Sequence, residues 1–292
     1  MTQRLQWIYG WLLLFPAMVM LMAFTHVPAV TTVINSFFST PRGRREAKFV
    51  GLANYENLIN DPTFWKVLTN NLWYALATIP ASIFLSLLMA LWVNDKLKGR
   101  SLVRMSFFAP TVLPLIAVAN IWLFFYTPGF GLIDQIRMGF FGLPENSWLG
   151  SQETVLICMM VVTIWKEAGF FMIFYLAALQ TIPPSLREAA AIEGASRSTF
   201  FWRVTFPLLM PTTLFVSINA VINSFRMVDH IFTMTGGGPD NASSLLLFYI
   251  YEVAFKFWDT AYAATLTVVL LVLLSLIALG QFFFMDRKVH YR

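Results

Sequence analysis

Long apolar runs separated by short polar segments make up most of the chain. A helix needs about 20 mostly apolar residues to cross a membrane, because each residue advances it by about 1.5 Å. Six runs reach that length, so the pattern predicts an all-α membrane protein with six transmembrane helices in a single domain, residues 1–292. The predicted spans are 7–25 (extending toward 38), 72–94, 105–126, 154–179, 204–225 and 261–285.

The first run also has features of a signal peptide, because Arg4 precedes it. It is longer than the usual apolar region of about 7–15 residues, and the segment THVPAV is a poor cleavage site. We therefore interpret it as a span. After it, GLANYENLINDPTFWKVLTNN has mixed helical spacing with a break at Pro62, which is typical of a short helix lying on the membrane.

The composition agrees with this membrane interpretation. The chain is 58% hydrophobic and 12% charged, whereas soluble domains average about 25% charged residues. The net charge of +5 comes without a basic block, so we expect no nucleic-acid partner. Cys158 is the only cysteine and the three histidines are far apart, which excludes a disulfide framework and disfavours a metal site or a membrane enzyme.

Lysines and arginines set the orientation of membrane helices, because they are enriched in cytoplasmic loops. With the N-terminus inside, the inner loops hold 11 cationic residues and the outer loops hold 8. The inner set is Arg4, Lys96, Lys98, Arg100, Arg104, Arg187, Arg197, Arg203, Arg287, Lys288 and Arg292. We predict that both termini, and the loop between the fourth and fifth spans, are cytoplasmic.

That loop, about 181–211, has a strong local pattern. Pro183 and Pro184 end the fourth span, and Ser185 with Glu188 forms the spacing of a capping box, which predicts a short helix from about residue 186. Three alanines favour the helix, Gly194 permits a left-handed turn at its end, and a second short helix begins near Ser196 or Ser198. A flat alanine surface ringed by charge is suited to lie in a groove of another protein, although a plain connection between two spans is the alternative.

Residues 188–207 closely resemble the EAA signature of the permease subunits of binding-protein-dependent ABC importers. That signature is Glu-Ala-Ala, three residues, Gly, nine residues, an aliphatic residue, one residue, Leu-Pro. Its fixed positions are occupied by Glu188, Ala189, Ala190, Gly194, Val204 and Pro207, with Phe206 where Leu is usual. The segments FVGLANYENLINDPTFW, LAALQTIPPSLREAA and TGGGPDNASSLLLFYIYEVAF are similar to the carbohydrate branch, which contains the maltose and glycerol-3-phosphate permeases.

The resemblance implies a type I ABC importer permease fold in a bacterial inner membrane, with cytoplasmic coupling helices. The implied partners are a second, non-identical permease, two ATPase subunits that hold ATP and Mg, and an extracytoplasmic solute-binding protein. The chain has no nucleotide-binding motif, so we expect no cofactor in it. The implied ATPase-coupling residues are Glu188, Ala189, Ala190, Gly194, Ala195 and Arg197.

Polar groups within the spans are candidates for substrate contact, because they are costly to place there. Lys166 and Glu167 lie in the fourth span, and Asn219, Asn223 and Arg226 share one face of the fifth. By resemblance to the maltose permease, Thr163, Glu167 and Phe170 also fall at or near sugar-facing positions. Lys166 or Arg226 would suit a phosphate. For Lys166 and Glu167 the alternatives are a structural role or contacts with the partner permease, and for Phe170 the alternative is plain packing.

The leading functional prediction is therefore a permease subunit that imports a sugar, a polyol or a glycerol phosphate and does not hydrolyse ATP itself. The alternative is an ion-coupled secondary carrier that uses Lys166 and Glu167 as its ion site. A self-contained carrier does not need a docking loop, which favours the first prediction.

Overall fold

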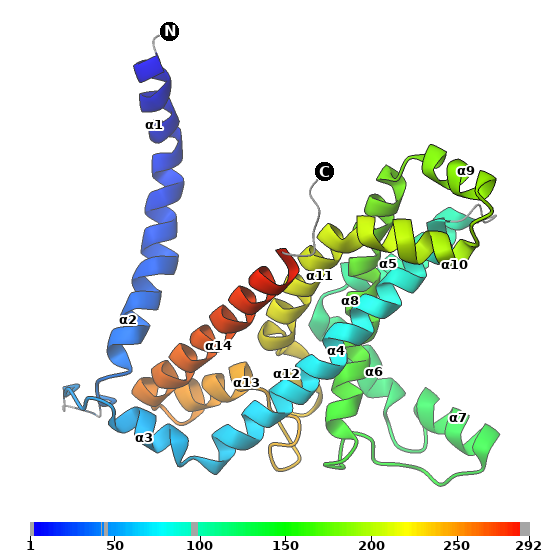
Figure 1. Cartoon of the computed structure of the whole chain (residues 1–292). Coiled ribbons are helices and arrows are strands. Elements are labelled where there is room, and N and C mark those ends of the chain that lie inside the picture. Colours follow the sequence, from blue (N-terminus) through cyan, green and yellow to red (C-terminus); the bar gives the residue numbers. More distant parts are fainter. Residues whose placement is uncertain (1–2, 42, 44–45, 95–98, 287–292) are drawn as a thin grey trace. The chain divides into compact units, whose positions relative to one another are not determined.

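The structure is a computed structural model, and it describes residues 3–41, 43, 46–94 and 99–286 (Figure 1). The described part is helical, with an isolated bridge between Phe38 and Phe49 and no strand. Five helical segments are long and apolar enough to cross a membrane, or six when one bent pair counts as a span. These segments are Tyr9–Asn35, Pro62–Asn94, Arg100–Val112 with Leu115–Phe125, Val155–Thr181, Arg197–Met234 and Thr260–Phe283. The predicted all-α membrane fold is confirmed.

Contacts within the chain divide it into two compact units, 1–62 with 250–273, and 63–249 with 274–292. The first unit holds α1 (Gln3–Leu21), the π-helical turn η1 (Met22–His26), α2 (Val27–Asn35), α3 (Ala53–Ile59), η3 (Glu252–Lys256) and the start of α14 (Thr260–Asp286). Inside it, Asn54 Nδ2 donates to the carbonyl oxygens of Ser36 and Phe38 at 2.8 Å. The single domain that the sequence predicts stays a prediction.

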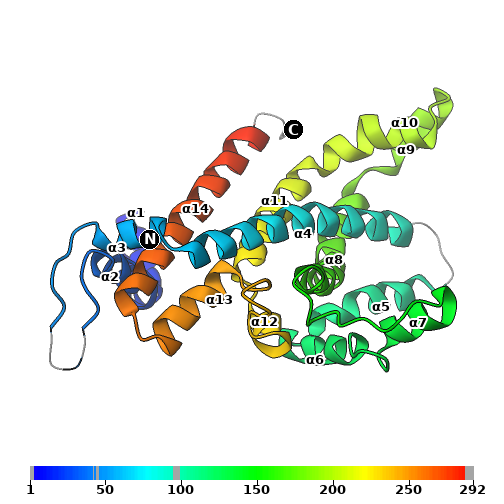
Figure 2. The ribbon, with the colours of Figure 1, turned by 90° about the horizontal axis from the view of Figure 1, so that it is seen from below.

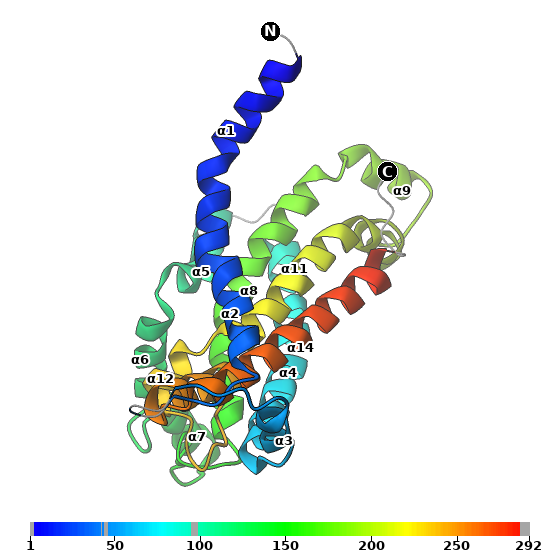
Figure 3. The ribbon, with the colours of Figure 1, turned by 90° about the vertical axis from the view of Figure 1, so that its left-hand side faces the viewer.

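The second unit contains every predicted site residue. Its helices are α4 (Pro62–Asn94, from its second residue on), α5 (Arg100–Val112), α6 (Leu115–Phe125), α7 (Leu132–Phe141), α8 (Val155–Thr181), α9 (Pro184–Ile192), α10 (Arg197–Phe200), α11 (Phe206–Arg226) and α12 (Asp229–Met234), and α13 (Leu246–Tyr251) begins in it. Figures 2 and 3 show α8 between α5 and α6 on one side and α4 and α11 on the other.

Two apolar clusters surround α8 in this unit. One contains Tyr74, Met159 and Val162 with residues of α6 and α12, and the other contains Phe171 and Tyr175 with residues of α4 and α11. Lipid tails are as apolar as these side chains, so close packing rather than exclusion of water stabilises the clusters within a membrane. Helix α8 is the central element because neighbours cover most of its circumference.

The third predicted span is broken, which corrects the expectation of one continuous helix over 105–126. The chain bends by 103° between α5 and α6, and Leu113 and Pro114 take extended conformations at the bend. Proline disfavours the helical conformation in the residue before it and lacks the N–H that would continue the helix. Pro114 therefore ends α5 at Val112.

Other boundaries also differ from the sequence prediction. Pro62 separates α3 from α4 as predicted, but α4 starts there and runs through the second span, which was predicted to begin at residue 72. The first span continues past residue 25 to Asn35, through the π-helical turn, which agrees with its predicted extension toward residue 38. The orientation prediction rests partly on Arg42, Arg44, Arg45, Lys96, Lys98, Arg287, Lys288 and Arg292, which lie outside the described residues.

Candidate functional site

The loop between α8 and α11 folds into two short helices joined at Gly194. Gly194 has a φ of +74°, so it takes the left-handed conformation that the sequence predicts. The N–H of Ala195 bonds to Ala190 O at 2.9 Å and the N–H of Gly194 bonds to Ala191 O at 3.1 Å. This pair of bonds is the Schellman arrangement, which satisfies the last carbonyls of α9 and turns the chain sharply.

The start of α9 differs from the prediction. Helix α9 begins at Pro184, and Pro183 caps it without a side-chain hydrogen bond. Ser185 therefore lies inside the helix, and the predicted capping box with Glu188 does not form. Proline suits the first position of a helix because its missing N–H would have no helical partner there. The predicted side-chain cap is instead found at Ser196, which accepts a hydrogen bond from Thr199 N at 3.1 Å.

The two faces of α9 have different surroundings. Arg187, Ala190 and Ala191 on the inner face line a cavity of about 570 Å³, which the ends of α4 and α8 also border. The outer face carries Ser185, Glu188, Ala189 and Ile192 at helical spacing, and all four are exposed. Ile192 is 88% exposed, so the outer face of α9 includes one large apolar side chain. Figure 1 shows α9 at one end of α8, opposite α7.

The loop is coupled to the fifth span without an interruption. Helix α10 continues through the π-helical turn η2 (Phe201–Thr205) into α11, where Pro207 occupies the first turn. On the other side, only Ile182 and Pro183 separate α8 from α9. Helix α9 is therefore linked by short segments to both α8 and α11.

A buried polar cluster lies between α4, α8 and α11 (the cluster is defined as Thr78, Ser82, Thr163, Glu167, Asn223 and Ser224). Asn223 Nδ2 donates to Glu167 Oε2 at 2.6 Å, and this bond ties α11 to α8. The cluster borders a cavity of about 10 Å³, which is roughly the space of one water molecule. A cavity of that volume does not hold a sugar ring.

Tyr74 and His230 extend the polar cluster toward α12. The Tyr74 hydroxyl shares a short hydrogen bond with Thr163 Oγ1 and lies 3.1 Å from His230 Nε2, and the two rings stack. Sequence reasoning did not single out either residue. A signal was present in α4, because Asn71, Tyr74, Thr78, Ser82 and Ser86 repeat at three- and four-residue spacing and all are buried.

Lys166 points to the other side of α8 from Glu167. Its Nζ lies 2.7 Å from Leu113 O, 3.1 Å from Pro110 O and 3.4 Å from Thr111 O, at the break between α5 and α6. Adjacent residues on a helix point about 100° apart, which explains how two neighbours serve different helices. The structure therefore does not bring Lys166 into the polar cluster.

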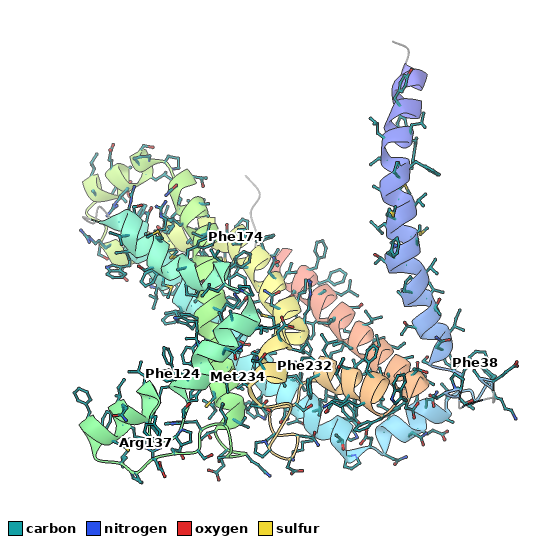
Figure 4. The ribbon with its side chains drawn as sticks, turned by 180° about the vertical axis from the view of Figure 1, so that it is seen from behind. Phe38, Phe124, Arg137, Phe174, Phe232 and Met234 are labelled. Carbon is teal, nitrogen blue, oxygen red and sulfur yellow. The ribbon has the colours of Figure 1, made fainter. Side chains whose placement is uncertain are left out.

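The remaining predicted substrate residues are dispersed. Phe170 packs against Phe171 and Phe174, with its ring centroid 5.1 Å from that of Phe174. Asn219 Nδ2 donates to Phe215 O of its own helix at 2.8 Å, and Arg226 is exposed at the end of α11. Figure 4 shows Phe174 nearer the α9 end of α8, and Phe124 and Arg137 nearer its α7 end. Of the predicted set, only Thr163, Glu167 and Asn223 share a site.

Comparison with known proteins identifies the class of transporter. Residues 82–291 match the family described as "Binding-protein-dependent transport system inner membrane component". This stretch includes α9, the Gly194 turn and the whole polar cluster apart from Thr78. The chain belongs to this family, and its apolar helices agree with a multi-pass protein of the inner membrane.

Two relatives and one solved structure illustrate the similarity. The sulfoquinovosyl glycerol transport system permease protein SmoG of Agrobacterium fabrum is 33% identical over 90% of this chain and 85% of its own. The sn-glycerol-3-phosphate transport system permease protein UgpA of the same organism is 30% identical over 97% of both chains. The solved structure is a bacterial alginate ABC transporter in complex with a periplasmic protein that binds an alginate pentasaccharide. One of its chains has the same fold, with a TM-score of 0.86 and 21% identity, and the match covers 98% of this chain and 96% of that one.

Proposed function

We propose that the chain is one of two transmembrane subunits of an ATP-driven importer. It moves a sugar, a related polyol or a glycerol phosphate from an extracytoplasmic binding protein into the bacterial cytoplasm. The observation that carries the proposal is α9, a helix with an exposed outer face that lies within the family's signature. It follows α8 after two residues and is linked to α11 through the Gly194 turn, α10 and η2. The names of SmoG and UgpA support the substrate class.

The proposed mechanism uses α9 as a lever. ATPase subunits, which hold ATP and Mg, bind the outer face of α9 and move it when they close. Because α9 is joined to α8 and, through α10 and η2, to α11, the movement acts on both partners of the Glu167–Asn223 hydrogen bond. Separation of the two helices opens the polar cluster to a substrate whose hydroxyls its amide and hydroxyl groups can bind.

The remaining components follow from this mechanism. We propose that both termini and α9 lie on the cytoplasmic side, that the second permease is a different chain, and that no cofactor binds to this chain. The predicted coupling residues fall into two groups. Glu188 and Ala189 lie on the outer face of α9, whereas Ala190, Ala195 and Arg197 line the inner cavity and Gly194 forms the turn.

Ile192 provides the sharpest test of docking. A few side chains dominate most protein interfaces, and truncating one of them costs about 2 kcal/mol or more, which is about a 30-fold change in affinity. We expect Ile192→Glu to reduce binding of the ATPase subunits to the permease in lipid nanodiscs by at least about tenfold. The matched control is Ile136→Glu on α7, which introduces the same charge at the opposite end of α8 and is expected to leave binding unchanged.

Equal binding by the Ile192 variant and the unmodified permease would contradict docking through the outer face of α9. The same assembly separates the importer from the alternative carrier. Uptake by this chain in vesicles without any ATPase subunit, driven by an ion gradient, would overturn the proposed function.

A further inference from the structure

The break between α5 and α6 leaves backbone carbonyls without helical partners. In a continuous helix, Pro110 O would accept a hydrogen bond from the N–H of residue 114, but that residue is a proline and has none. Thr111 O also loses its partner, because the chain is extended at Leu113 and Pro114. Unpaired backbone groups are costly within a membrane, so such a break persists only where other groups satisfy them.

Lys166 supplies the missing donors. An ammonium group has three N–H donors, and Nζ of Lys166 lies within hydrogen-bonding distance of three carbonyl oxygens, those of Pro110, Thr111 and Leu113. Its positive charge also lies at the C-terminal end of α5, where the helix dipole favours a cation. Lys166 is 8% exposed, and its donors are all directed at the break, so none is left for a substrate anion.

A second observation places α5 against the same face of α8. A Cβ at Gly169 would lie 2.0 Å from Phe107 O, so only glycine permits this approach of the two helices. Gly169 follows Lys166 by three residues and therefore shares its face. Thr111 Oγ1 completes the contact by donating to Lys166 O at 3.4 Å.

The direction of α6 depends on this break. After the bend of 103°, Leu115, Val118 and Ala119 of α6 are buried in the apolar cluster that contains Tyr74. Tyr74 in turn bonds to Thr163 of the polar cluster. The break is thus connected through α6 to the wall of the candidate substrate site.

We propose that Lys166 is a positioning residue, which holds the α5–α6 break through its three carbonyl contacts and so fixes α6 beside the polar cluster. This role replaces a direct contact of Lys166 with substrate. It stands on the geometry of this chain, and only its effect on transport rests on the proposed function.

The first test measures the break itself. In the assembly, Cys158 is replaced by alanine, and spin labels are attached at Met105→Cys on α5 and Phe124→Cys on α6. Both labelled positions are exposed. The labels report the distance across the break. We expect Lys166→Met, which keeps the stem and removes the donors, to broaden or shift the distance distribution. Lys166→Arg is expected to restore the distance distribution of the unmodified protein. The control is Lys66→Met, which removes a lysine that pairs with Asp240 elsewhere in the chain, and it is expected to leave the distribution unchanged. An unchanged distribution in Lys166→Met would overturn the proposal.

A second measurement does not depend on the folding of a variant. In protein labelled with ¹⁵N at lysine Nζ and ¹³C at leucine carbonyls, solid-state NMR detects pairs at hydrogen-bonding distance. The contact of 2.7 Å between Lys166 Nζ and Leu113 O predicts a cross-peak, which is lost in Lys166→Arg because the label is then absent. Absence of that cross-peak in the unmodified protein would refute the assignment.

The transport readout distinguishes positioning from binding. We expect Lys166→Met to lower the maximal uptake rate by at least about fivefold for neutral and phosphorylated substrates alike, with the half-saturating concentration of loaded binding protein unchanged. A loss confined to phosphorylated substrates would identify Lys166 as an anion ligand and overturn the proposal. If the unmodified assembly transports nothing with ATP, the proposed function fails while the distance measurement still tests the role of Lys166.

Discussion

Gly194 is the residue whose conformation is most closely tied to the proposed coupling. Its φ of +74° is unfavourable for other residues, and no atom lies within 4 Å of the position that a Cβ would take. A substitution there therefore meets no clash, and its cost is backbone strain of about 1–2 kcal/mol, which asparagine partly avoids. The turn, rather than a contact, is what glycine supplies.

We expect Gly194→Val to lower the amount of substrate imported per ATP hydrolysed by several-fold, because the strained turn moves α9 relative to α11. Gly194→Asn is the matched control and is expected to retain most of the coupling. The measurement is the ratio of uptake to ATP hydrolysis in vesicles that contain the full assembly. Equal ratios for the valine variant and the unmodified protein would show that the turn does not set the coupling.

Sequence reasoning was most accurate where a residue's role is local. The left-handed turn at Gly194 follows from glycine's own backbone freedom, so it was predicted. The role of Lys166 depends on carbonyls more than fifty positions earlier in the chain, and no local pattern identifies them. Tyr74 belongs to a row of polar positions on α4 that was visible in the sequence, whereas its contact with His230 joins α4 to α12 and no local pattern indicates it.

At the scale of elements, α7 is held by a carboxylate outside the spans. Asp134 is fully buried, and it accepts hydrogen bonds from Gly129 N at 2.8 Å, Asn146 N at 3.1 Å and Trp148 Nε1 at 2.7 Å. Burial alone would raise the pKa of Asp134, but these hydrogen bonds and the charge of Arg137 outweigh it and hold the pKa below its usual value. The ionised carboxylate is therefore the form that organises this segment.

The lowered pKa of Asp134 gives the stability of the segment a defined pH dependence. Its contribution is fully present above the pKa of the unfolded segment, about 4, and is lost as the pH falls through the lower folded value. We expect amide hydrogen exchange of residues 129–148 to stay slow from pH 7 to about 4 and to accelerate below it, after correction for intrinsic rates. In Asp134→Asn, the amides of residues 129–148 should exchange faster at neutral pH, and the acceleration below about pH 4 should be absent. If the variant still shows that acceleration, another group is responsible for it.

The elements themselves were predictable to different degrees. Apolar run length located the spans, because the membrane imposes a minimum length on each helix. The break in the third span was missed because its run is mostly apolar and carries no charge, although Pro110 and Pro114 were visible in it. The π-helical turn before α11 was also missed, since it depends on how the loop meets the span rather than on composition.

At the scale of the whole molecule, an exposed helix, α9, lies at one end of two spans, α8 and α11, and a polar cluster lies between those spans. The cluster's cavity of about 10 Å³ is too small for a sugar. In the proposed cycle α8 and α11 separate at the Glu167–Asn223 hydrogen bond when α9 moves, because α9 is linked to α8 by two residues and to α11 through the Gly194 turn, α10 and η2. Docked ATPase subunits supply the energy for that movement in the proposed cycle.

The most direct test is uptake by the complete assembly in vesicles. The assembly is supplied with its binding protein and a panel of oligosaccharides, polyols and sn-glycerol 3-phosphate, and ATP hydrolysis and uptake are measured together. We expect one compound to stimulate hydrolysis several-fold, and its uptake to stop without ATP and to be strongly reduced in Ile192→Glu. Uptake by this chain alone, independent of ATP, would contradict the central claim.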